Sequence, residues 1–351
     1  MNIKKPTLII CTPGFAKDEA DTSCLPMQQS LLLSLKENYP QLKIVVLSFQ
    51  YPYYEKKYEW FGIEVRSFNG QNRGGIKKIV LRRKLQATLK KLNGENNIIG
   101  IISFWYGECA WVAKKFVDRN QLKHFCWLLG QDARAGNPYP KKLKIGAHEL
   151  IVLSDALQKE FEKNYGIQPA HVIPPGIDTN EFIDPAPAKD IDIVAAGSLI
   201  VLKQYDLLIN VIAAIKPQHP SIKVTLIGEG PERKKIESLI ASSDLQQNIL
   251  LTGALPHKET LQWMQRAKLF LHISSYEGFG VVMTEALYAG CEVISFCKPM
   301  QKDIPHWHIV KDPTAMQQKA IELLQSDLKM EKLCVFNVNE TAKKLMGLFG
   351  F

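Results

Sequence analysis

The sequence lacks several features that would place it in a specialised class of proteins. Its seven cysteines are odd in number and include no Cys-x-x-Cys pair, so neither a disulfide framework nor a zinc site is predicted. It has no run of about 18 apolar residues, the length needed to span a membrane. The apolar stretch at 6–15 has no long hydrophobic region and no small-residue cleavage site, and it is predicted to be a β-strand rather than a signal peptide. These absences favour a cytoplasmic protein.

Positive charge is concentrated in the first half of the chain. The formal net charge is +9, and residues 1–172 hold 26 Lys and Arg against 15 Asp and Glu, while residues 173–351 hold 18 against 20. The densest stretch, 74–92, has seven basic residues, no acidic one and apolar residues at roughly helical spacing, which predicts a basic amphipathic helix. Two interpretations of this helix are open. In the first, its apolar stripe packs on its own domain. In the second, the helix attaches to anionic lipid, where each basic residue near the surface contributes about 1 kcal/mol to binding. No interleaved aromatics or DNA- or RNA-binding motif accompany it, so no nucleic-acid partner is predicted.

Short apolar runs alternate with segments of helical periodicity along the whole chain. Strands are predicted in two series, at 7–12, 43–49, 98–103, 124–129 and 149–154, and then at 192–197, 223–228, 248–253, 269–274 and 292–296. Helices are predicted at 25–38, 107–118, 155–165, 204–216, 231–242, 258–266, 281–289 and 314–326. Continuous apolar strands separated by helices are typical of parallel sheets covered on both faces. Two such series predict an α/β protein with two Rossmann-like domains.

The segment 171–190 marks a domain boundary, because it contains four prolines and no helical period. The prediction is therefore an N-terminal domain at 1–172 and a C-terminal domain at 173–334. The last segment, 335–351, is predicted to be a helix that crosses back to the N-terminal domain. Two facing domains of this kind leave a cleft, and ligands in such folds bind beyond the carboxyl ends of the strands.

The most informative stretch is YEGFGVVMTEALYAG at 276–290. Glu277 precedes Gly278 and Gly280, two glycines that permit close backbone approach to a ligand, and a helix is predicted to follow. The free N–H groups at the start of that helix suit a phosphate, and Glu285 lies one turn further along. This arrangement fits a diphosphate between two polyols, the shape of a nucleotide-sugar. The alternative is that Glu285 caps the helix or pairs locally, and that Glu277 is simply exposed on the loop.

The C-terminal half closely resembles glycosyltransferase family 4, whose members are retaining enzymes of the GT-B architecture. The resemblance rests on four segments, 172–182, 226–239, 249–255 and 274–294, and the last contains the family's Glu-x7-Glu motif. Agreement is looser for the Pro-Gly-Phe loop after the first strand, for 128–134 and for 150–161.

The resemblance implies a role for individual residues. Glu277 would contact the transferred sugar, Glu285 the ribose and Lys203 the phosphates, where its charge would stabilise the leaving diphosphate in place of a metal ion. No metal or cofactor is implied beyond a UDP- or GDP-linked sugar as substrate. The implied donor-binding residues are Gly14, Ser198, Lys203, Gly228, Leu255, Glu277, Gly278, Phe279, Gly280, Val281, Val282 and Glu285.

Two departures from the family pattern affect the catalytic assignment. Ser198 stands where the family usually has an arginine, and Arg134 is a candidate replacement. Leu129 stands where the family often has a histidine, which leaves Gln131 and Asp132 as the polar candidates beside the donor sugar. The catalytic set implied by the resemblance is thus Glu277, Lys203 and Asp132.

The segment 103–109 ends a strand of the first domain and supplies acceptor-side candidates. Trp105, Tyr106 and Glu108 are predicted to stack on and hydrogen-bond an acceptor sugar, with Arg134 nearby, whereas core packing is the alternative for the two aromatics. The prediction is a metal-independent, retaining glycosyltransferase that acts on a glycan or lipid-linked acceptor, in the cytoplasm or on the inner face of the cytoplasmic membrane. Alternatives are a GT-B epimerase or phosphorylase and a non-catalytic sugar-nucleotide-binding subunit.

Overall fold

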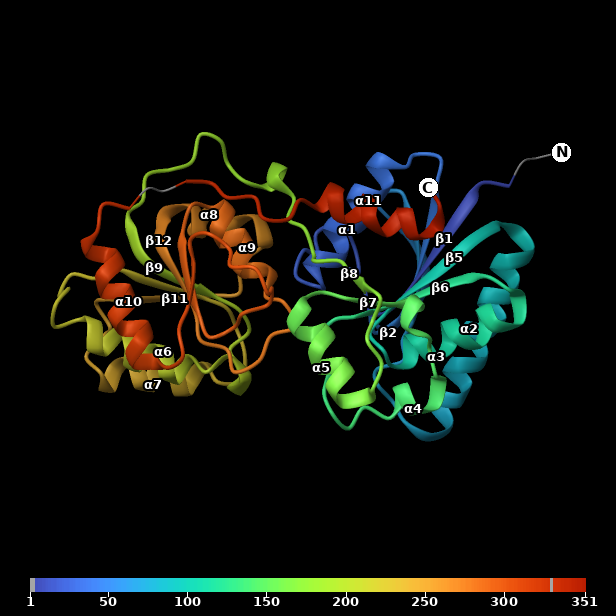
Figure 1. Ribbon diagram of the computed structural model, residues 1–351, viewed down its shortest axis with the longest axis horizontal. Helices are drawn as coiled ribbons and strands as arrows, with labels where there is room; N and C mark the ends of the chain where they lie inside the picture. The colour runs from blue at the N-terminus through green and yellow to red at the C-terminus, as the bar shows by residue number, and fades with distance from the viewer. Residues whose placement is uncertain (1–3, 329–330) are drawn as a thin grey trace. The chain divides into compact units, whose positions relative to one another are not determined.

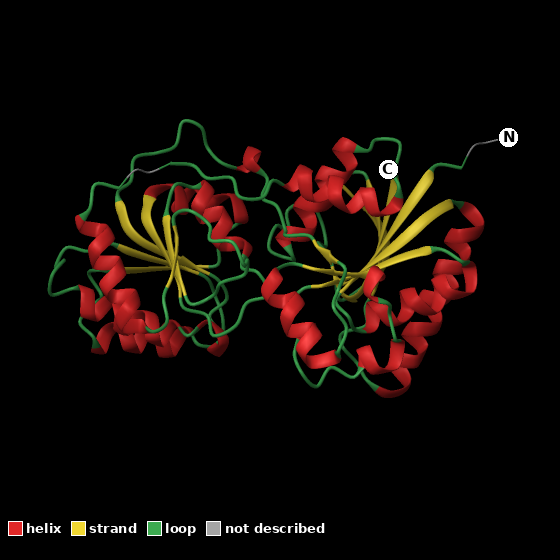
Figure 2. Cartoon of the chain, viewed as in Figure 1, coloured by secondary structure: helices red, strands yellow, loops and turns green. Residues whose placement is uncertain are grey.

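A computed structural model describes residues 4–328 and 331–351 and divides the chain into two compact units (Figure 1). Unit 1 comprises Met1–Gly176 and Val338–Phe351, and unit 2 comprises Ile177–Asn337. The first boundary lies four residues beyond the predicted one, because the backbone N–H of Ile173 still pairs with Val152 and Pro174 accepts a hydrogen bond from Thr341. Each unit has a central sheet covered by helices (Figure 2).

The described part of unit 1 contains an eight-stranded sheet in the order β3-β4-β2-β1-β5-β6-β7-β8. Its strands are β1 (Pro6–Gly14), β2 (Lys43–Tyr51), β3 (Glu55–Trp60), β4 (Ile63–Phe68), β5 (Asn97–Phe104), β6 (Lys123–Leu128), β7 (Leu150–Val152) and β8 (His171–Val172). Neighbouring strands are parallel except β3 and β4, which form an antiparallel hairpin at the edge. The hairpin was not predicted, since the sequence EKKYEW of β3 is mostly exposed and carries no apolar run.

The helices of unit 1 are α1 (Pro26–Asn38), α2 (Gly75–Glu95), α3 (Glu108–Asn120), α4 (Tyr139–Leu143), α5 (Asp155–Tyr165) and α11 (Val338–Phe349), with short 3-10 turns η1 (Gln131–Ala133) and η2 (Ala147–Glu149). The basic helix α2 buries one stripe against the sheet and α3, formed by Leu81, Leu85, Leu89 and Leu92. Its apolar residues nearer the N-terminus, Ile76, Ile79 and Val80, are exposed. The apolar stripe therefore packs on its own domain from Leu81 onward, and attachment of this helix to lipid stays a prediction.

The terminal helix α11 belongs to unit 1. The Asn339 side-chain oxygen accepts a 2.7 Å hydrogen bond from the Ser34 hydroxyl on α1, and the Phe349 ring lies 5.1 Å from the Phe125 ring on β6. A side chain at Gly100 would lie 2.4 Å from Phe349, so a glycine on β5 makes room for the helix. Within the described residues, no helix has both the length and the apolar character needed to cross a bilayer.

The described part of unit 2 contains a six-stranded parallel sheet in the order β11-β10-β9-β12-β13-β14. Its strands are β9 (Ile191–Ala196), β10 (Val224–Ile227), β11 (Ile249–Gly253), β12 (Ala267–His272), β13 (Glu292–Ser295) and β14 (Trp307–Ile309). Its helices are α6 (Tyr205–Ile215), α7 (Arg233–Ser242), α8 (His257–Arg266), α9 (Val281–Tyr288) and α10 (Pro313–Gln325), with 3-10 turns η3 (Thr179–Glu181) and η4 (Val201–Lys203).

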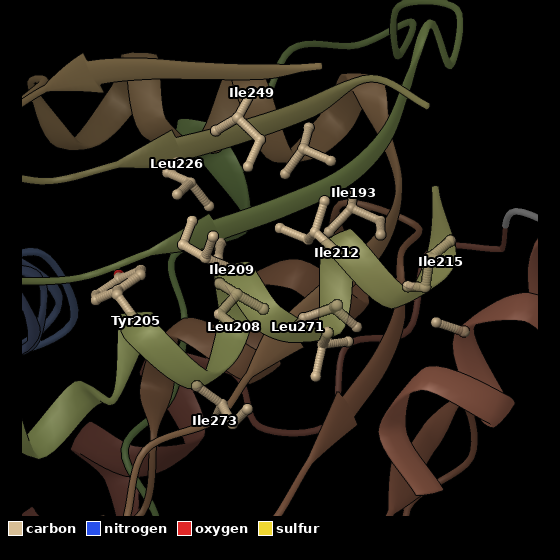
Figure 3. Close-up of a cluster of buried hydrophobic side chains, with 14 of the residues drawn as sticks. Ile193, Tyr205, Leu208, Ile209, Ile212, Ile215, Leu226, Ile249, Leu271 and Ile273 are labelled. Atoms are coloured by element: carbon tan, nitrogen blue, oxygen red, sulfur yellow. The ribbon is translucent and has the colours of Figure 1, made fainter. Parts of the chain in front are cut away.

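Two hydrophobic clusters cover the two faces of the unit 2 sheet. On one face, α6, α7 and α10 pack on alternate strand residues such as Ile193 and Leu226 (Figure 3). On the other face, α8 and α9 pack on the remaining strand residues, among them Val194 and Phe270. Burial on both faces explains the continuous apolar runs of these strands.

The order of the strands reverses once in each sheet. In unit 1 the chain runs from β1 outward to β2 and then returns to the other side of β1 at β5, and in unit 2 it does the same around β9, with β12 on the returning side. Connections leave in opposite directions at such a point, so the carboxyl ends of the two strands border a crevice where ligands bind in open α/β sheets. The sequence places its motif residues after these strands.

Candidate functional site

Lys203 and Glu277 form an ion pair at the reversal point of unit 2. Lys203 ends η4 after β9, Glu277 follows β12, and the Lys203 Nζ atom contacts Glu277 Oε1. The two residues are 74 positions apart in the sequence, and both side chains are mostly buried, 19% and 15% exposed. The structure thus brings together the implied phosphate-binding lysine and the implied sugar-binding carboxylate.

His272, the last residue of β12, also contacts the carboxylate of Glu277. Its Nε2 atom lies 2.8 Å from Glu277 Oε1, and its ring is 4% exposed. Burial lowers the pKa of His272 despite the neighbouring carboxylate, which favours a neutral imidazole with its proton on Nε2. Although burial raises the pKa of Glu277, His272 and Lys203 together lower it to about 2. Glu277 is therefore an ionised acceptor at neutral pH.

Helix α9 begins directly after the glycine turn. Gly280 precedes it with a φ of +87°, a conformation that glycine adopts without strain, and the backbone N–H groups of Val281 and Val282 lie in the first turn. Gly278 lies between Glu277 and Phe279, and the side chain of Phe279 is buried, with its ring 5.7 Å from Phe336. Only the backbone of Phe279 can therefore meet a ligand.

Glu285 lies on the second turn of α9 and contacts His257, the first residue of α8. The Nε2 atom of His257 lies 2.8 Å from Glu285 Oε1, and its Nδ1 atom lies 2.8 Å from Glu181 Oε2 on η3. Burial lowers the pKa of His257, but the two carboxylates raise it to about 10. The imidazole is therefore a cation between two anions.

Glycines bring the loops after β9 and β10 into direct contact. A side chain at Gly228, where φ is +152°, would lie 1.9 Å from the carbonyl oxygen of Gly197. Gly228 and Gly230 therefore let the loop after β10 pack closely on the backbone of Gly197 and Leu199. Ser198 is exposed beside the contact, whereas Leu255 after β11 is partly buried against the cluster under α8 and α9.

The acceptor-side candidates of unit 1 have different environments from those expected. Trp105 follows β5 and is partly exposed, with a φ of +62°, but Tyr106 is fully buried and stacks on Phe161. The contact predicted for Tyr106 is therefore wrong, because its ring packs in the core and its hydroxyl accepts a hydrogen bond from Ile145 N. Arg134 is exposed in the turn after η1, and a side chain at Gly14 would make only ordinary contact with Tyr51 at 3.6 Å.

Glu108 is occupied by bonds within unit 1. Its carboxylate pairs with Arg82 and with Lys78 at 2.8 Å, and it accepts a 2.6 Å hydrogen bond from the hydroxyl of Tyr139. Arg82 also lies over the ring of Trp111 at 3.8 Å. Burial raises the pKa of Glu108, but these donors bring it below its usual value. The cluster joins α2 to α3 and α4, so Glu108 fastens these helices and is not presented as a free acceptor-binding group.

Asp132 has a structural environment that does not fit the catalytic role implied by the resemblance. Its side chain is buried at 8% exposure and accepts hydrogen bonds from the backbone N–H groups of Tyr106 at 2.8 Å, Gly130 at 2.9 Å and Leu129 at 3.1 Å. Burial raises the pKa of Asp132 above its usual value, although these bonds oppose the shift. The carboxylate is used to hold the turn after β6, which corrects the prediction.

The described residues contain no group of three or more His, Cys, Asp or Glu side chains arranged to hold a metal ion. The His-Trp-His segment places His306 and His308 each 2.7 Å from the carboxylate of Glu292. Asp190 and Asp192 pair with Arg266 and Lys268. These histidine and aspartate side chains are thus occupied by contacts within unit 2.

Two residues that contact the Glu-x7-Glu carboxylates, His257 and His272, were missed by the sequence interpretation. Each stands in or beside a predicted element, since His272 lies in the predicted strand 269–274 and His257 directly precedes the predicted helix 258–266. The contact with Glu285 spans 28 residues, and periodicity cannot reveal such a partner.

Residues 176–335 match the model of the family Glycosyl transferases group 1. The gpi3 subunit of the phosphatidylinositol N-acetylglucosaminyltransferase of Schizosaccharomyces pombe is 36% identical over 127 residues, which are 35% of this chain and 28% of the yeast protein. The 2-deoxystreptamine N-acetyl-D-glucosaminyltransferase of Niallia circulans is 28% identical over 156 residues, 43% of this chain and 40% of that protein. The chain thus spans less than half the length of these curated relatives.

Solved structures are similar over a larger part of the chain. The crystal structure of Anabaena HepE in complex with UDP and glucose has a TM-score of 0.71 at 15% identity, covering 98% of this chain and 99% of that one. The structure of a mutant of S. aureus TarM in complex with Fondaparinux, alpha-GlcNAc-glycerol and UDP has a TM-score of 0.63 at 18% identity, covering 77% of this chain and 59% of that one. These similarities show the fold.

Proposed function

We propose that this chain, a member of glycosyltransferase family 4 with the GT-B fold, transfers a sugar from a nucleotide diphosphate donor to a hydroxyl acceptor with retention of configuration. The observation that carries the proposal is the Lys203–Glu277 pair at the reversal point of the unit 2 sheet, directly before the first turn of α9. It combines a cation for phosphate, an ionised acceptor for sugar hydroxyls and a helix N-terminus in one place.

Donor binding exchanges the partners of this pair. The diphosphate takes the ammonium of Lys203 and the N–H groups at the start of α9, and Glu277, released from Lys203 but still held by His272, accepts hydrogen bonds from the sugar. The bond between the anomeric carbon and the phosphate oxygen breaks, and the diphosphate leaves with the bonding electrons. Lys203 and the helix N-terminus stabilise that charge without a metal ion, because both are already positioned. The acceptor oxygen bonds to the anomeric carbon on the face that the diphosphate leaves, which retains the configuration, and the acceptor's proton passes to an oxygen of the departing diphosphate. Glu285 binds the ribose.

The donor we propose is UDP-N-acetylglucosamine, with a glycan or lipid-linked acceptor. Support comes from the names of the relatives, which include N-acetylglucosaminyltransferases acting on phosphatidylinositol and on 2-deoxystreptamine. The two structures of similar fold described above contain UDP.

The test is a transfer and hydrolysis assay in EDTA with UDP-N-acetylglucosamine, UDP-glucose and GDP-mannose, each with and without a panel of glycan and lipid-linked acceptors. We expect turnover of UDP-N-acetylglucosamine, with the sugar joined to the acceptor in the donor's anomeric configuration. Loss of activity in EDTA would contradict a metal-independent reaction. Release of an epimer, or phosphorolysis of a glycan, would indicate one of the other GT-B enzymes, and binding without turnover would indicate a non-catalytic role.

Attachment to an anionic membrane surface is proposed for the N-terminal part of α2. Ile76, Ile79, Val80 and Arg83 recur at helical spacing and are all exposed, so apolar and basic groups share an outward face. We expect retention on phosphatidylserine vesicles at low salt. Reversing the charges of Lys77 and Arg83 to glutamate is expected to weaken binding by at least roughly 30-fold, since each basic residue near the surface contributes about 1 kcal/mol.

A matched control for the vesicle experiment is the double reversal of the exposed Lys234 and Lys258 in unit 2. This control changes the net charge equally but leaves α2 intact. Equal loss of binding in both double variants would show a general charge effect and contradict a site on α2.

A further inference from the structure

We propose that His257 is a positioning residue that fixes the carboxylate of Glu285 for the ribose of the donor, within a bridge that runs from Glu181 through His257 to Glu285. The inference rests on the proposed function, in which Glu285 binds the ribose hydroxyls.

The geometry requires a particular state of the imidazole. A carboxylate oxygen lies 2.8 Å from each of its two nitrogens, from Glu181 on Nδ1 and from Glu285 on Nε2. A neutral imidazole carries only one N–H and would turn a lone pair toward one of the carboxylates. Both contacts are therefore hydrogen bonds only when the ring is doubly protonated and donates to both.

The position of His257 in the fold supports the same state. As the first residue of α8, its ring lies at a helix N-terminus, which disfavours a cation, so the two carboxylates are what maintain the charge. They also hold its pKa at about 10 despite burial. The three side chains are 33%, 16% and 13% exposed, from Glu181 at the outer end to Glu285 at the inner end.

The bridge has a consequence for ligand binding. The N–H of His257 engages Oε1 of Glu285 and thereby fixes the rotation of the carboxylate, which directs Oε2 to a hydroxyl of the ribose. A carboxylate fixed in advance loses less conformational freedom when the ligand binds. Removing His257 should therefore weaken the contact with the ribose hydroxyls and leave contacts with the diphosphate unchanged.

The experiment compares the binding of UDP and of 2′,3′-dideoxy-UDP by calorimetry to the full chain and its variants. The wild-type chain is expected to prefer UDP. In His257→Ala the affinity for UDP should fall roughly 10- to 100-fold, the range for loss of a charged hydrogen bond, while the affinity for the dideoxy nucleotide stays the same. His257→Gln, which keeps one N–H donor, should restore part of the preference. Glu181→Gln removes the outer anion and should give a smaller loss of the same kind.

The control is Lys258→Gln, which removes a positive charge from the same turn of α8 at an exposed position and should change neither affinity. In the transfer assay, His257→Ala should raise the KM for the donor more than it lowers kcat. If His257→Ala and Glu181→Gln both kept the full wild-type preference for UDP over the dideoxy nucleotide, the positioning role of His257 would be overturned, while the proposed donor site would stand. A wild-type chain that binds both nucleotides equally would instead show that Glu285 does not bind the ribose, and the proposed donor site would fail with it.

Discussion

The variants Lys203→Ala and Glu277→Gln are each expected to reduce kcat by roughly 10²–10³-fold, the usual effect of removing one preorganised charge-stabilising group. In Lys203→Ala the developing charge on the leaving diphosphate loses its cation. In Glu277→Gln the amide has the same shape as the carboxylate, but it is neutral and accepts weaker hydrogen bonds from the sugar. The two side chains contact each other, so their effects should not be additive.

Initial rates in EDTA and nucleotide affinity by calorimetry distinguish the two roles. Lys203→Ala should weaken the binding of UDP itself, whereas Glu277→Gln should leave UDP binding nearly intact and weaken only the binding of the sugar-linked donor. The exposed Lys258→Gln serves as the control for loss of one positive charge. Unchanged turnover in both site variants would contradict the assignment of the site.

The same pair gives the chain a defined response to acid. The pKa of Glu277 is about 2 in the folded chain, below its ordinary value of 4.5, so its ionised form stabilises the fold above pH 4.5. That contribution is lost as the pH falls from 4.5 toward 2. In Lys203→Ala the pKa of Glu277 should move back toward 4.5. The difference in the free energy of unfolding between this variant and the wild type should therefore shrink as the pH falls through this interval.

Asp132→Ala is expected to lower the free energy of unfolding of unit 1 by about 3 kcal/mol or more, because it leaves three backbone N–H groups without their acceptor. These are the N–H groups of Tyr106, Leu129 and Gly130, which now donate to the buried carboxylate. A loss of this size corresponds to roughly 6–12 °C in the midpoint of thermal unfolding for a unit of this length. At temperatures well below that midpoint, unit 2 of the Asp132→Ala variant should still bind nucleotide.

Thermal unfolding and nucleotide calorimetry on the same samples test this expectation. The control is Asp118→Ala, since Asp118 is 56% exposed and pairs with Lys114 at the surface, where an ion pair contributes about 1 kcal/mol or less. If Asp132→Ala unfolded at the wild-type temperature but no longer transferred sugar, the catalytic role implied by the family resemblance would be right and the structural role wrong.

The alternation of apolar strands and amphipathic helices was readable from the sequence, because strands buried on both faces need continuous apolar runs and their helices need one apolar stripe. Strand β3 of the edge hairpin was not, since its mostly exposed residues carry no such run. The Glu-x7-Glu motif was readable for a similar reason. The strand end, the glycine turn and the helix start that position Glu277 and Glu285 are all local in sequence.

The partners of these carboxylates were decided by the tertiary structure. Lys203 reaches Glu277 across 74 residues because β9 and β12 are neighbours in the sheet, and His257 reaches Glu285 because α8 and α9 cover the same face. Asp132 accepts bonds of both kinds, from the N–H groups of Leu129 and Gly130 in its own turn and from the N–H of Tyr106, 26 residues away after β5. The sequence alone determined the fold class and the site's acidic residues, whereas strand order and helix packing decided which charges meet.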